Sequence, residues 1–343
     1  VEQYTQDVNA YRHSVEEYKL SVEAFYADTI HAYDNKSAMI ADTTLKLGQT
    51  AMTCGNETVG DNGGSFYKIT NKSSLNAIQL ANELYAEPFT FYDTIPASVK
   101  SYGAIGDGVA DDTTAIQTAV NNNTFVYFPA GKYHTTSTIT LNEGNRIVGA
   151  GRNTVELINS FSTGTFKLAN NVFIENINFE TDNNTGYALV GENTFAVNIN
   201  HVDSLGGYFN NTNSKFLKMS GSWHTLLLND CVIDCGTNTE YAIDLESDGN
   251  DSVHKDLIMR DVFVDTWEAT TGGSIRLDSL FGATLQNCII RSSHLALCMK
   301  RSKATGFCVI DANYCKIDST DKTNGVFIDA YCVLNDYYCS YTP

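Results

Sequence analysis

The sequence predicts an all-β protein whose main part is a parallel β-helix, preceded by an N-terminal coiled-coil helix and a small β domain. Three observations support this prediction. Strand-like segments repeat every 24 to 31 residues in the second half of the chain, a heptad pattern occupies its start, and glycine and asparagine supply most of the turns. We therefore expect three parts, residues 1–44, 45–97 and 98–343.

The first part carries an apolar stripe with a period of 3.5 residues. Its members alternate β-branched and aromatic side chains: Val1, Tyr4, Val8, Tyr11, Val15, Tyr18, Val22 and Phe25. Such a stripe is typical of a coiled-coil seam, which other chains must cover. We predict a trimerising coiled coil over residues 1–44, the alternative being an amphipathic helix that packs on its own domain.

The second part is rich in turn residues. Gly55–Gly64 has turn chemistry and leads into the strand-like segment Ser65–Thr70. These glycines do not predict a nucleotide-binding loop, because no Lys-Ser or Lys-Thr pair and no helical pattern follow them. We expect a small β cap or adaptor domain over residues 45–97.

The third part is a repeat. Its turns align on seven short polar or histidine residues: Asn176, His201, Asp230, Asp261, Asn287, Asp311 and Asp336. Apolar residues stand two before, one after and three after these positions, with Ser204 as the exception. A repeat of this length predicts a solenoid, and its alternation of two predicts stacked parallel strands. The aligned residues should mark bends, where short polar side chains can bond the backbone.

Each repeat contains a second strand, whose outward residues should stack into ladders ~4.8 Å apart. One ladder reads Lys218, Asp244, Arg276, Cys298 and Phe327, and the next reads Ser220, Glu246, Asp278, Lys300 and Asp329. Two carboxylates ~5–9 Å apart are what glycoside hydrolysis needs.

We predict that Asp244, Glu246 and Asp278 are catalytic and that Arg276, Lys300 and Asp329 bind substrate. A lyase would instead use Arg276 or Lys300 as its base. The alternative without chemistry is an ordinary ion-paired solenoid surface, or a surface that binds glycan without cleaving it.

Aromatic side chains near these ladders are candidates for stacking on sugar rings. Trp223 and Trp267 are the only tryptophans, and both stand in segments between strands of adjacent turns. Together with Tyr241 they would line a groove beside the carboxylates. The alternative is that these rings pack onto the solenoid.

Composition excludes several function classes. The chain has 22 Lys and Arg against 40 Asp and Glu, a net charge of −18. This balance argues against nucleic acid and anionic membrane surfaces as partners, and no apolar run is long enough for membrane insertion. The nine cysteines lack metal-ligand spacing, so we expect buried thiols, no metal and no cofactor. Residues 1–20 have no signal-peptide pattern, which favours synthesis in a cytoplasm.

The start of the third part resembles a known family. Val99–Gly108, Asp111–Gln117, Val126–Tyr133 and Ile147–Gly151 resemble the entry to the pectate-lyase-like right-handed β-helix of bacteriophage tailspikes. The resemblance implies that a helix following Asp112 closes the open end of the solenoid. It also implies a homotrimeric virion protein, made in the host cytoplasm, that joins other tail proteins and binds a bacterial surface polysaccharide.

We therefore expect a tail spike that binds a bacterial surface polysaccharide and depolymerises it, by hydrolysis, during host attachment. The alternative is a non-enzymatic receptor-binding adhesin or a structural tail protein on the same fold. Apolar residues at outward positions, Val232, Phe263 and Ile289, favour coverage by neighbouring subunits. A covering loop of the same chain is the alternative.

Overall fold

The computed structural model describes residues 30–74, 77–89, 96–159, 163–181, 186–204, 215–235, 240–248, 256–266, 272–280, 282–303, 308–319 and 325–342. The chain divides into two compact units, Val1–Tyr102 and Gly103–Pro343. No helix within the described ranges is long and apolar enough to cross a membrane.

The first unit contains a sheet with the strand order β1-β2-β3-β5-β4. Its elements are β1 (Ile30–Tyr33), α2 (Lys36–Ala41), β2 (Thr50–Thr53), β3 (Ser65–Thr70), β4 (Ile78–Gln79) and β5 (Tyr85–Phe89), followed by β6 (Ala97–Ser98) and the 3-10 helix η1 (Val99–Tyr102). Its core consists of Met39, Leu45, Ala51, Tyr67, Ile69, Leu80 and Ala86. The small β fold predicted from Gly55–Thr70 is present.

The prediction of a coiled coil over residues 1–44 needs correction at its C-terminal end. Ile30–Tyr33 forms a strand that pairs with Thr50–Thr53, and Lys36–Ala41 is a short helix beside it. Tertiary pairing with β2 therefore replaces the weak continuation of the heptad. Residues 1–29, which carry the main heptad stripe, lie outside the described residues.

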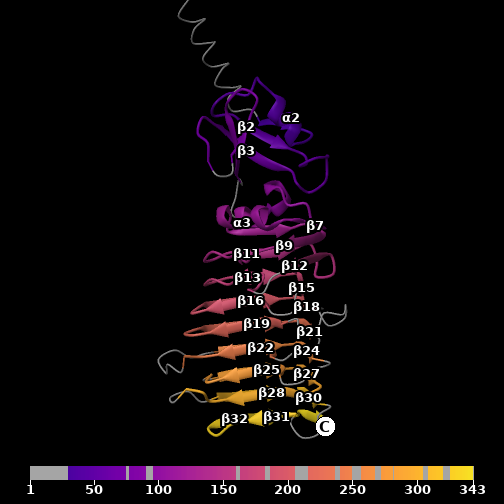
Figure 1. Ribbon diagram of the computed structural model, residues 1–343, viewed down its shortest axis with the longest axis vertical. Coiled ribbons are helices and arrows are strands. Elements are labelled where there is room, and N and C mark those ends of the chain that lie inside the picture. Colours follow the sequence, from indigo (N-terminus) through magenta and orange to yellow (C-terminus); the bar gives the residue numbers. More distant parts are fainter. Residues whose placement is uncertain are drawn as a thin grey trace, which may run out of the picture. The chain divides into compact units, whose positions relative to one another are not determined.

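The second unit is a right-handed parallel β-helix of about eight turns, built of three sheets (Figure 1). The first sheet contains β10 (Ile139–Thr140), β13 (Phe166–Lys167), β16 (Tyr187–Glu192), β19 (Lys215–Ser220), β22 (Tyr241–Glu246), β25 (Gly273–Asp278), β28 (Leu295–Lys300) and β31 (Val326–Ile328). The second sheet contains β8 (Phe125–Phe128), β11 (Arg146–Gly149), β14 (Phe173–Glu175), β17 (Phe195–Asn200), β20 (His224–Asn229), β23 (Asp256–Arg260), β26 (Gly282–Gln286), β29 (Cys308–Asn313) and β32 (Cys332–Tyr337). The third sheet contains β7 (Asp107–Asp111), β9 (Gly131–Thr135), β12 (Val155–Asn159), β15 (Asn178–Thr181), β18 (Asp203–Ser204), β21 (Val232–Cys235), β24 (Phe263–Thr266), β27 (Ile289–Ser292), β30 (Lys316–Ser319) and β33 (Ser340–Thr342).

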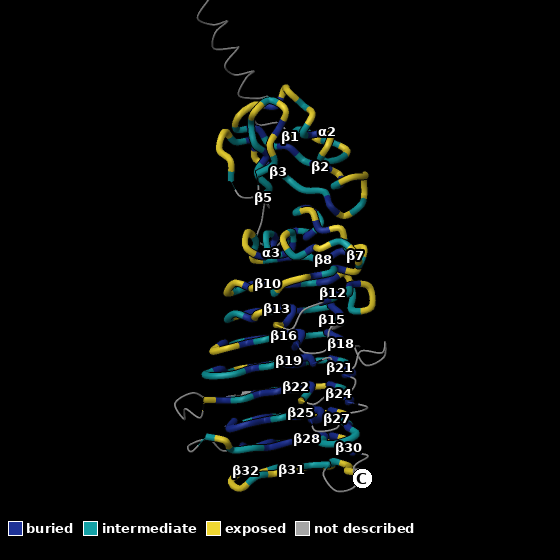
Figure 2. The backbone as a smooth tube through the Cα atoms, viewed as in Figure 1, coloured by how far each residue is buried: buried dark blue, intermediate teal, exposed yellow. Residues whose placement is uncertain are grey.

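The core of the β-helix lies between the three sheets. Inward residues such as Leu245, Leu277 and Met299 are fully buried. Figure 2 shows buried and intermediate residues along the strands of the middle turns. Apolar inward positions and mixed outward positions follow the alternation of two that the sequence predicts. The outward faces are therefore free to vary in chemistry.

The predicted helix after Asp112 is confirmed as α3 (Thr113–Asn122), with Ile116, Ala119 and Val120 buried. Asp112 occupies the N-cap position, but its carboxylate accepts hydrogen bonds from the N–H groups of Ile105 (2.6 Å) and Gly106 (3.1 Å). The carboxylate of Asp111 accepts the N–H of Thr113 at 3.0 Å. The side chain of Asp112 thus holds the preceding loop, and Asp111 satisfies the helix end.

Five of the seven predicted bends are confirmed. Asn176, His201, Asp230, Asp261 and Asn287 all have φ angles between 48° and 59°, and the N–H of each donates to the carbonyl that precedes the next bend. The last two bends are at Tyr314 (φ 54°) and Tyr338 (φ 57°), whereas Asp311 and Asp336 lie inside β29 and β32. The stacked register fixes these bends even where the sequence supplies no short polar residue.

The predicted outward stripe also stacks in register, from Val232 to Phe263 to Ile289. Ile289 is 40% exposed, and the guanidinium of Arg291 lies 5.1 Å from the centre of the Phe263 ring.

Six of the nine cysteines are buried, as expected for small apolar residues, whereas Cys54 is exposed and Cys332 and Cys339 are half-buried.

Candidate functional site

The strand register of the first sheet confirms the first predicted ladder from Lys218 to Phe327, and the second predicted ladder from Glu246 to Lys300. Asp244 pairs with Arg276 and Glu246 with Asp278 between β22 and β25, and Asp278 pairs with Lys300 of β28. All five positions lie outward, because Leu245, Leu277 and Met299 between them point into the core. We call Asp244, Glu246, Arg276 and Asp278 the carboxylate cluster.

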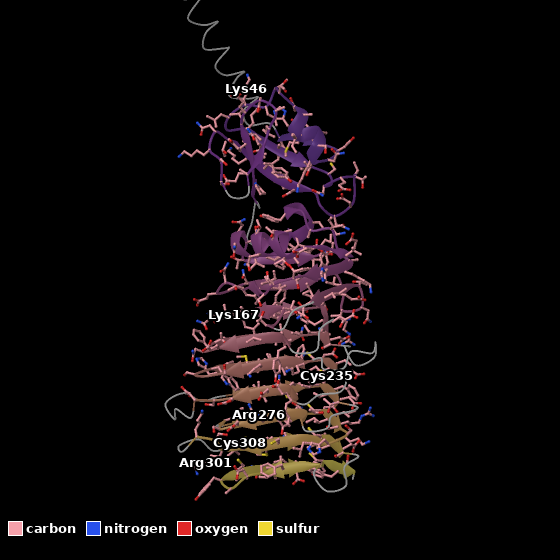
Figure 3. The ribbon with its side chains drawn as sticks, viewed as in Figure 1. Lys46, Lys167, Cys235, Arg276, Arg301 and Cys308 are labelled. Atoms are coloured by element: carbon pink, nitrogen blue, oxygen red, sulfur yellow. The ribbon has the colours of Figure 1, made fainter. Side chains whose placement is uncertain are left out.

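Arg276 lies at the centre of this cluster, on β25 (Figure 3). Its Nε is 2.5 Å from Oδ1 of Asp244, its Nη2 is 3.5 Å from Oε2 of Glu246, and its Nη1 is 4.0 Å from Oδ2 of Asp278. Burial alone would lower the pKa of Arg276, but the hydrogen bond to Asp244 and the three negative charges raise it above its ordinary value. The arginine therefore holds its charge and fixes the three carboxylates around it.

Asp244 is nearly buried, with 6% of its surface exposed. Asp244 contacts Tyr187 as well as Arg276. The hydroxyl of Tyr187 reaches across β19 from β16 and lies 3.4 Å from Oδ2 of Asp244. Burial, followed by the charges of Asp244 and Glu240, raises the pKa of Tyr187 far above its ordinary value, so this hydroxyl stays a donor. The ladder pattern did not predict Tyr187, because the contact spans two strand positions rather than one.

Asp278 is the most buried member of the cluster, at 1% exposure. Its oxygens accept hydrogen bonds from the N–H of Ser302 (2.8 Å), the hydroxyl of Ser302 and the hydroxyl of Ser279 (2.9 Å). Burial raises the pKa of Asp278, but these hydrogen bonds outweigh it and hold the pKa below its ordinary value. Asp278 therefore stays ionised and positions the segment that follows β28.

Glu246 has the most accessible carboxylate of the three, with 34% of its side chain exposed. Its Oε1 is 3.2 Å from Nζ of Lys303, and its Oε2 faces Arg276. Of the three carboxylates, that of Glu246 is therefore the one most open to solvent.

A cavity of about 400 Å³ lies beside the cluster, lined by Arg301, Ser302, Lys303, Asp329, Ala330 and Tyr331. The guanidinium of Arg301 (Figure 3) lies 4.4 Å from the centre of the Tyr331 ring, which is 73% exposed. Asp329 accepts the N–H of Arg301 at 3.4 Å. The predicted residue Asp329 thus belongs to this cavity.

Sequence reasoning missed Arg301, Lys303 and Tyr331, because ladders describe strands and these residues follow β28 and β31. A signal was nevertheless present, since residues 300–303 place three cations within four positions of a strongly acidic chain. Lys300 is half-buried, and its carbonyl accepts the N–H of Ser279 at 2.9 Å.

The predicted aromatic residues occupy different positions. Trp223 is fully buried, and its indole N–H donates to the carbonyl of Glu246 at 3.0 Å, so it supports β22 and exposes no ring face. Tyr241 is half-buried, and burial together with a hydrogen bond to the thiol of Cys298 raises its pKa. Trp267 lies outside the described residues. Among the residues that are described, no three His, Cys, Asp or Glu side chains are grouped as metal ligands.

Comparison with known proteins relates the chain to carbohydrate-active and phage proteins over short segments. A stretch of 54 residues is 43% identical to the pre-neck appendage protein of Bacillus phage B103, and 66 residues are 41% identical to mannuronan C5-epimerase AlgE2 of Azotobacter vinelandii. Each match covers 16% of this chain but only 6% and 7% of those relatives.

Solved structures share the fold over most of the chain. WceF of Pantoea stewartii, a glycan biofilm modifying enzyme with a tailspike-like parallel β-helix, has a TM-score of 0.56 at 13% identity over 93% of this chain and 49% of its own. Tailspike gp49 of Acinetobacter baumannii bacteriophage Fri1, a capsular polysaccharide depolymerase, has a TM-score of 0.54 at 12% identity over 91% and 69%. Residues 97–317 match the family described as rhamnogalacturonase A/epimerase, pectate lyase-like, and because this match spans well over half of the sequence, the chain belongs to that family.

Proposed function

We propose that this protein binds a bacterial surface polysaccharide on the outer face of its first sheet and hydrolyses it, as part of a tail spike during host attachment. The observation that carries the proposal is the convergence of three carboxylates within 4.0 Å of Arg276, beside a cavity lined by further charged and aromatic side chains. The tailspike fold of the structural neighbours supports it.

The chemistry would use Asp244 and Glu246 as the working pair. They stand two residues apart on one face of β22, which places them ~7 Å apart by the rise of a strand. This separation lies in the range of ~6.5–9.5 Å that leaves room for an attacking water in inverting glycosidases. One carboxyl group would protonate the leaving oxygen, and the other would activate the water.

The surrounding residues would position these groups and the sugar chain. Arg276 orients both carboxylates, and Asp278, which stays ionised, holds the segment that carries Arg301 and Lys303. Lys300, Asp329 and Tyr331 would contact the sugar units next to the cleaved bond. A lyase mechanism is less compatible with the geometry, because Arg276, a candidate base, is surrounded by carboxylates that keep it protonated.

A second function is favoured by one observation: Asp244 and Asp278 are nearly buried and already occupied by hydrogen bonds. Under this alternative the same face binds the polysaccharide without cleaving it, and the protein acts as an adhesin or a structural tail protein. The cluster would then be an ion-paired surface that fixes the shape of the binding face.

We also propose that the protein acts as a homotrimer joined to other tail proteins. The heptad stripe of residues 1–29 and the partly exposed row Val232, Phe263 and Ile289 support this assembly. Light scattering should give three times the mass of the chain, and a monomer at micromolar concentration would contradict the proposal.

The test of cleavage is to incubate the protein with surface polysaccharides of candidate hosts and to measure new reducing ends together with the ultraviolet absorbance of unsaturated sugars. Hydrolysis predicts reducing ends without absorbance. Glu246→Gln and Asp244→Asn should each lower the rate by about 100-fold or more, the usual scale for loss of an acid or base. Rising absorbance would indicate a lyase, and binding without new ends would leave the adhesin.

Glu156→Gln is the matched control, because Glu156 is also ion-paired, 2.6 Å from Lys132, and partly exposed, but lies on β12 of the third sheet. Its rate should equal that of the unmodified protein. An equal loss in this control would mean that the effect of Glu246→Gln reflects general damage to the fold.

A further inference from the structure

The bends between the second and third sheets change their chemistry in the last two turns. Five earlier bends place Asn, Asp or His at positive φ, residue types that tolerate this conformation. Tyr314 and Tyr338 adopt the same conformation with φ of 54° and 57°, although a bulky ring gains no local hydrogen bond there. Strained backbone conformations cluster at functional sites, which points to a function for the side chains of Tyr314 and Tyr338.

The two tyrosine rings form an exposed aromatic platform. Their centroids are 5.1 Å apart and their planes differ by 9°, so the rings stack on one another. Tyr314 is nevertheless 63% exposed and Tyr338 82% exposed. The stacking orders the ring of Tyr314 while leaving much of its surface open to solvent.

Tyr314 also lines a cavity of about 400 Å³ together with Arg260, Asp261, Gln286 and Asn287. These five residues come from three successive turns of the solenoid, at the ends of β23, β26 and β29. The amide of Asn287 donates to the carboxylate of Asp261 at 2.5 Å, which fixes both side chains. The cavity therefore combines an aromatic surface with fixed donors and acceptors.

We propose that this cavity, floored by Tyr314, is a second carbohydrate-binding site that takes one pyranose unit of a polysaccharide. The C–H face of the sugar stacks on the tyrosine ring, and its hydroxyl groups bond to Arg260, Asp261 and Gln286. This combination of an apolar surface with a few placed polar groups is the usual chemistry of a sugar subsite. The site lies between the second and third sheets, whereas the carboxylate cluster lies on the first sheet, so it needs no cleavage chemistry.

The test measures retention on polysaccharides purified from candidate host strains, by affinity electrophoresis. Tyr314→Asn introduces the residue that the preceding turn carries at Asn287, so the fold is kept while the aromatic surface is removed. This variant should bind the retaining polymer about tenfold more weakly, which corresponds to a loss of about 1.4 kcal/mol. Tyr314→Phe keeps the ring and should bind within about twofold of the unmodified protein, and Arg260→Ala should weaken binding as Tyr314→Asn does.

The outcomes separate this proposal from its rivals and from the proposed hydrolysis. Unchanged retention of Tyr314→Asn, or retention of the unmodified protein on none of the polymers, would overturn the site. The proposed site would also be overturned if Tyr314→Asn changed the mass of the protein in solution without changing its binding to the polysaccharide. The surface around Tyr314 would then be a contact between copies of the chain. Because retention needs no bond cleavage, a failure of hydrolysis leaves the binding result fully readable.

Discussion

Asp278 illustrates how one side chain organises the structure around the carboxylate cluster. Its carboxylate is buried and accepts hydrogen bonds from two groups of Ser302 and from Ser279. Through them it holds the segment that carries Arg301 and Lys303. The position of residues 301–303 therefore depends on Asp278, a residue that is itself buried.

Replacing this residue tests its role. Asp278→Asn removes a charged acceptor from buried hydrogen bonds and should destabilise the fold by about 1–3 kcal/mol. The pKa of Asp278 is lowered in the folded state, so its contribution is complete above the pKa of the unfolded chain and is lost as the pH falls through the lower folded value. Thermal unfolding of the unmodified protein should therefore lose stability below about pH 4.

Asp278→Asn should lose less thermal stability than the unmodified protein as the pH falls over the same acid range. Asp336→Asn, at an exposed position of β32, is the control and should follow the unmodified profile. Parallel acid profiles for Asp278→Asn and the unmodified protein would show that this carboxylate does not contribute as described.

The positions of some side chains follow from the sequence, and those of others do not. The outward position of Glu246 follows from strand alternation, but the burial of Trp223 does not, because the same ring could stack on a sugar or pack inward. Tyr331, in contrast, is exposed at a bend after the last strand of the first sheet. Its ring contacts the guanidinium of Arg301 from the neighbouring turn, and this contact is not predictable from either segment alone.

At the scale of strands, the stacked register determines which groups meet. Inward and outward side chains alternate along each strand with a period of two residues. This alternation and the recurring bends were enough to align β22, β25 and β28, because a one-residue slip would move the core residues outward. The last two bends were misplaced, since Tyr314 and Tyr338 carry no turn signal. The segments between strands follow no repeat, so the contacts of residues 301–303 lay beyond sequence analysis.

The register of β25 and β28 can be tested at Gly273. A Cβ atom there would lie 1.8 Å from the carbonyl oxygen of Leu295, its partner in the neighbouring strand. Gly273→Ala should therefore force the two strands apart and destabilise the protein by about 3 kcal/mol, at the upper end of ordinary overpacking. Urea unfolding measures this loss.

Gly151→Ala is the matched control, because the nearest atom to its Cβ would be the side-chain hydroxyl of Thr154 at 3.2 Å, which can move. Its unfolding free energy should change by less than about 1 kcal/mol. A mild effect of Gly273→Ala would mean that β25 and β28 are not paired as described.

At the scale of the whole molecule, the β-helix separates stability from function. The inward residues of its stacked turns form one continuous core, whereas each outer face carries its own chemistry. The first sheet presents the carboxylate cluster and its cavity, and the bend between the second and third sheets presents the platform of Tyr314. The core is built from inward residues, so the chemistry of the outward residues can differ from one face to the next.

Binding of a polysaccharide to the outer face of the first sheet can be tested by hydrogen exchange. Glu246→Gln should be saturated with oligosaccharides from the polymer that retains the protein, so that bound sugar is not cleaved. We expect slower amide exchange than in the free variant in Tyr241–Glu246, Gly273–Asp278 and residues 295–303. Unchanged exchange in these three segments while the sugar remains bound would contradict it.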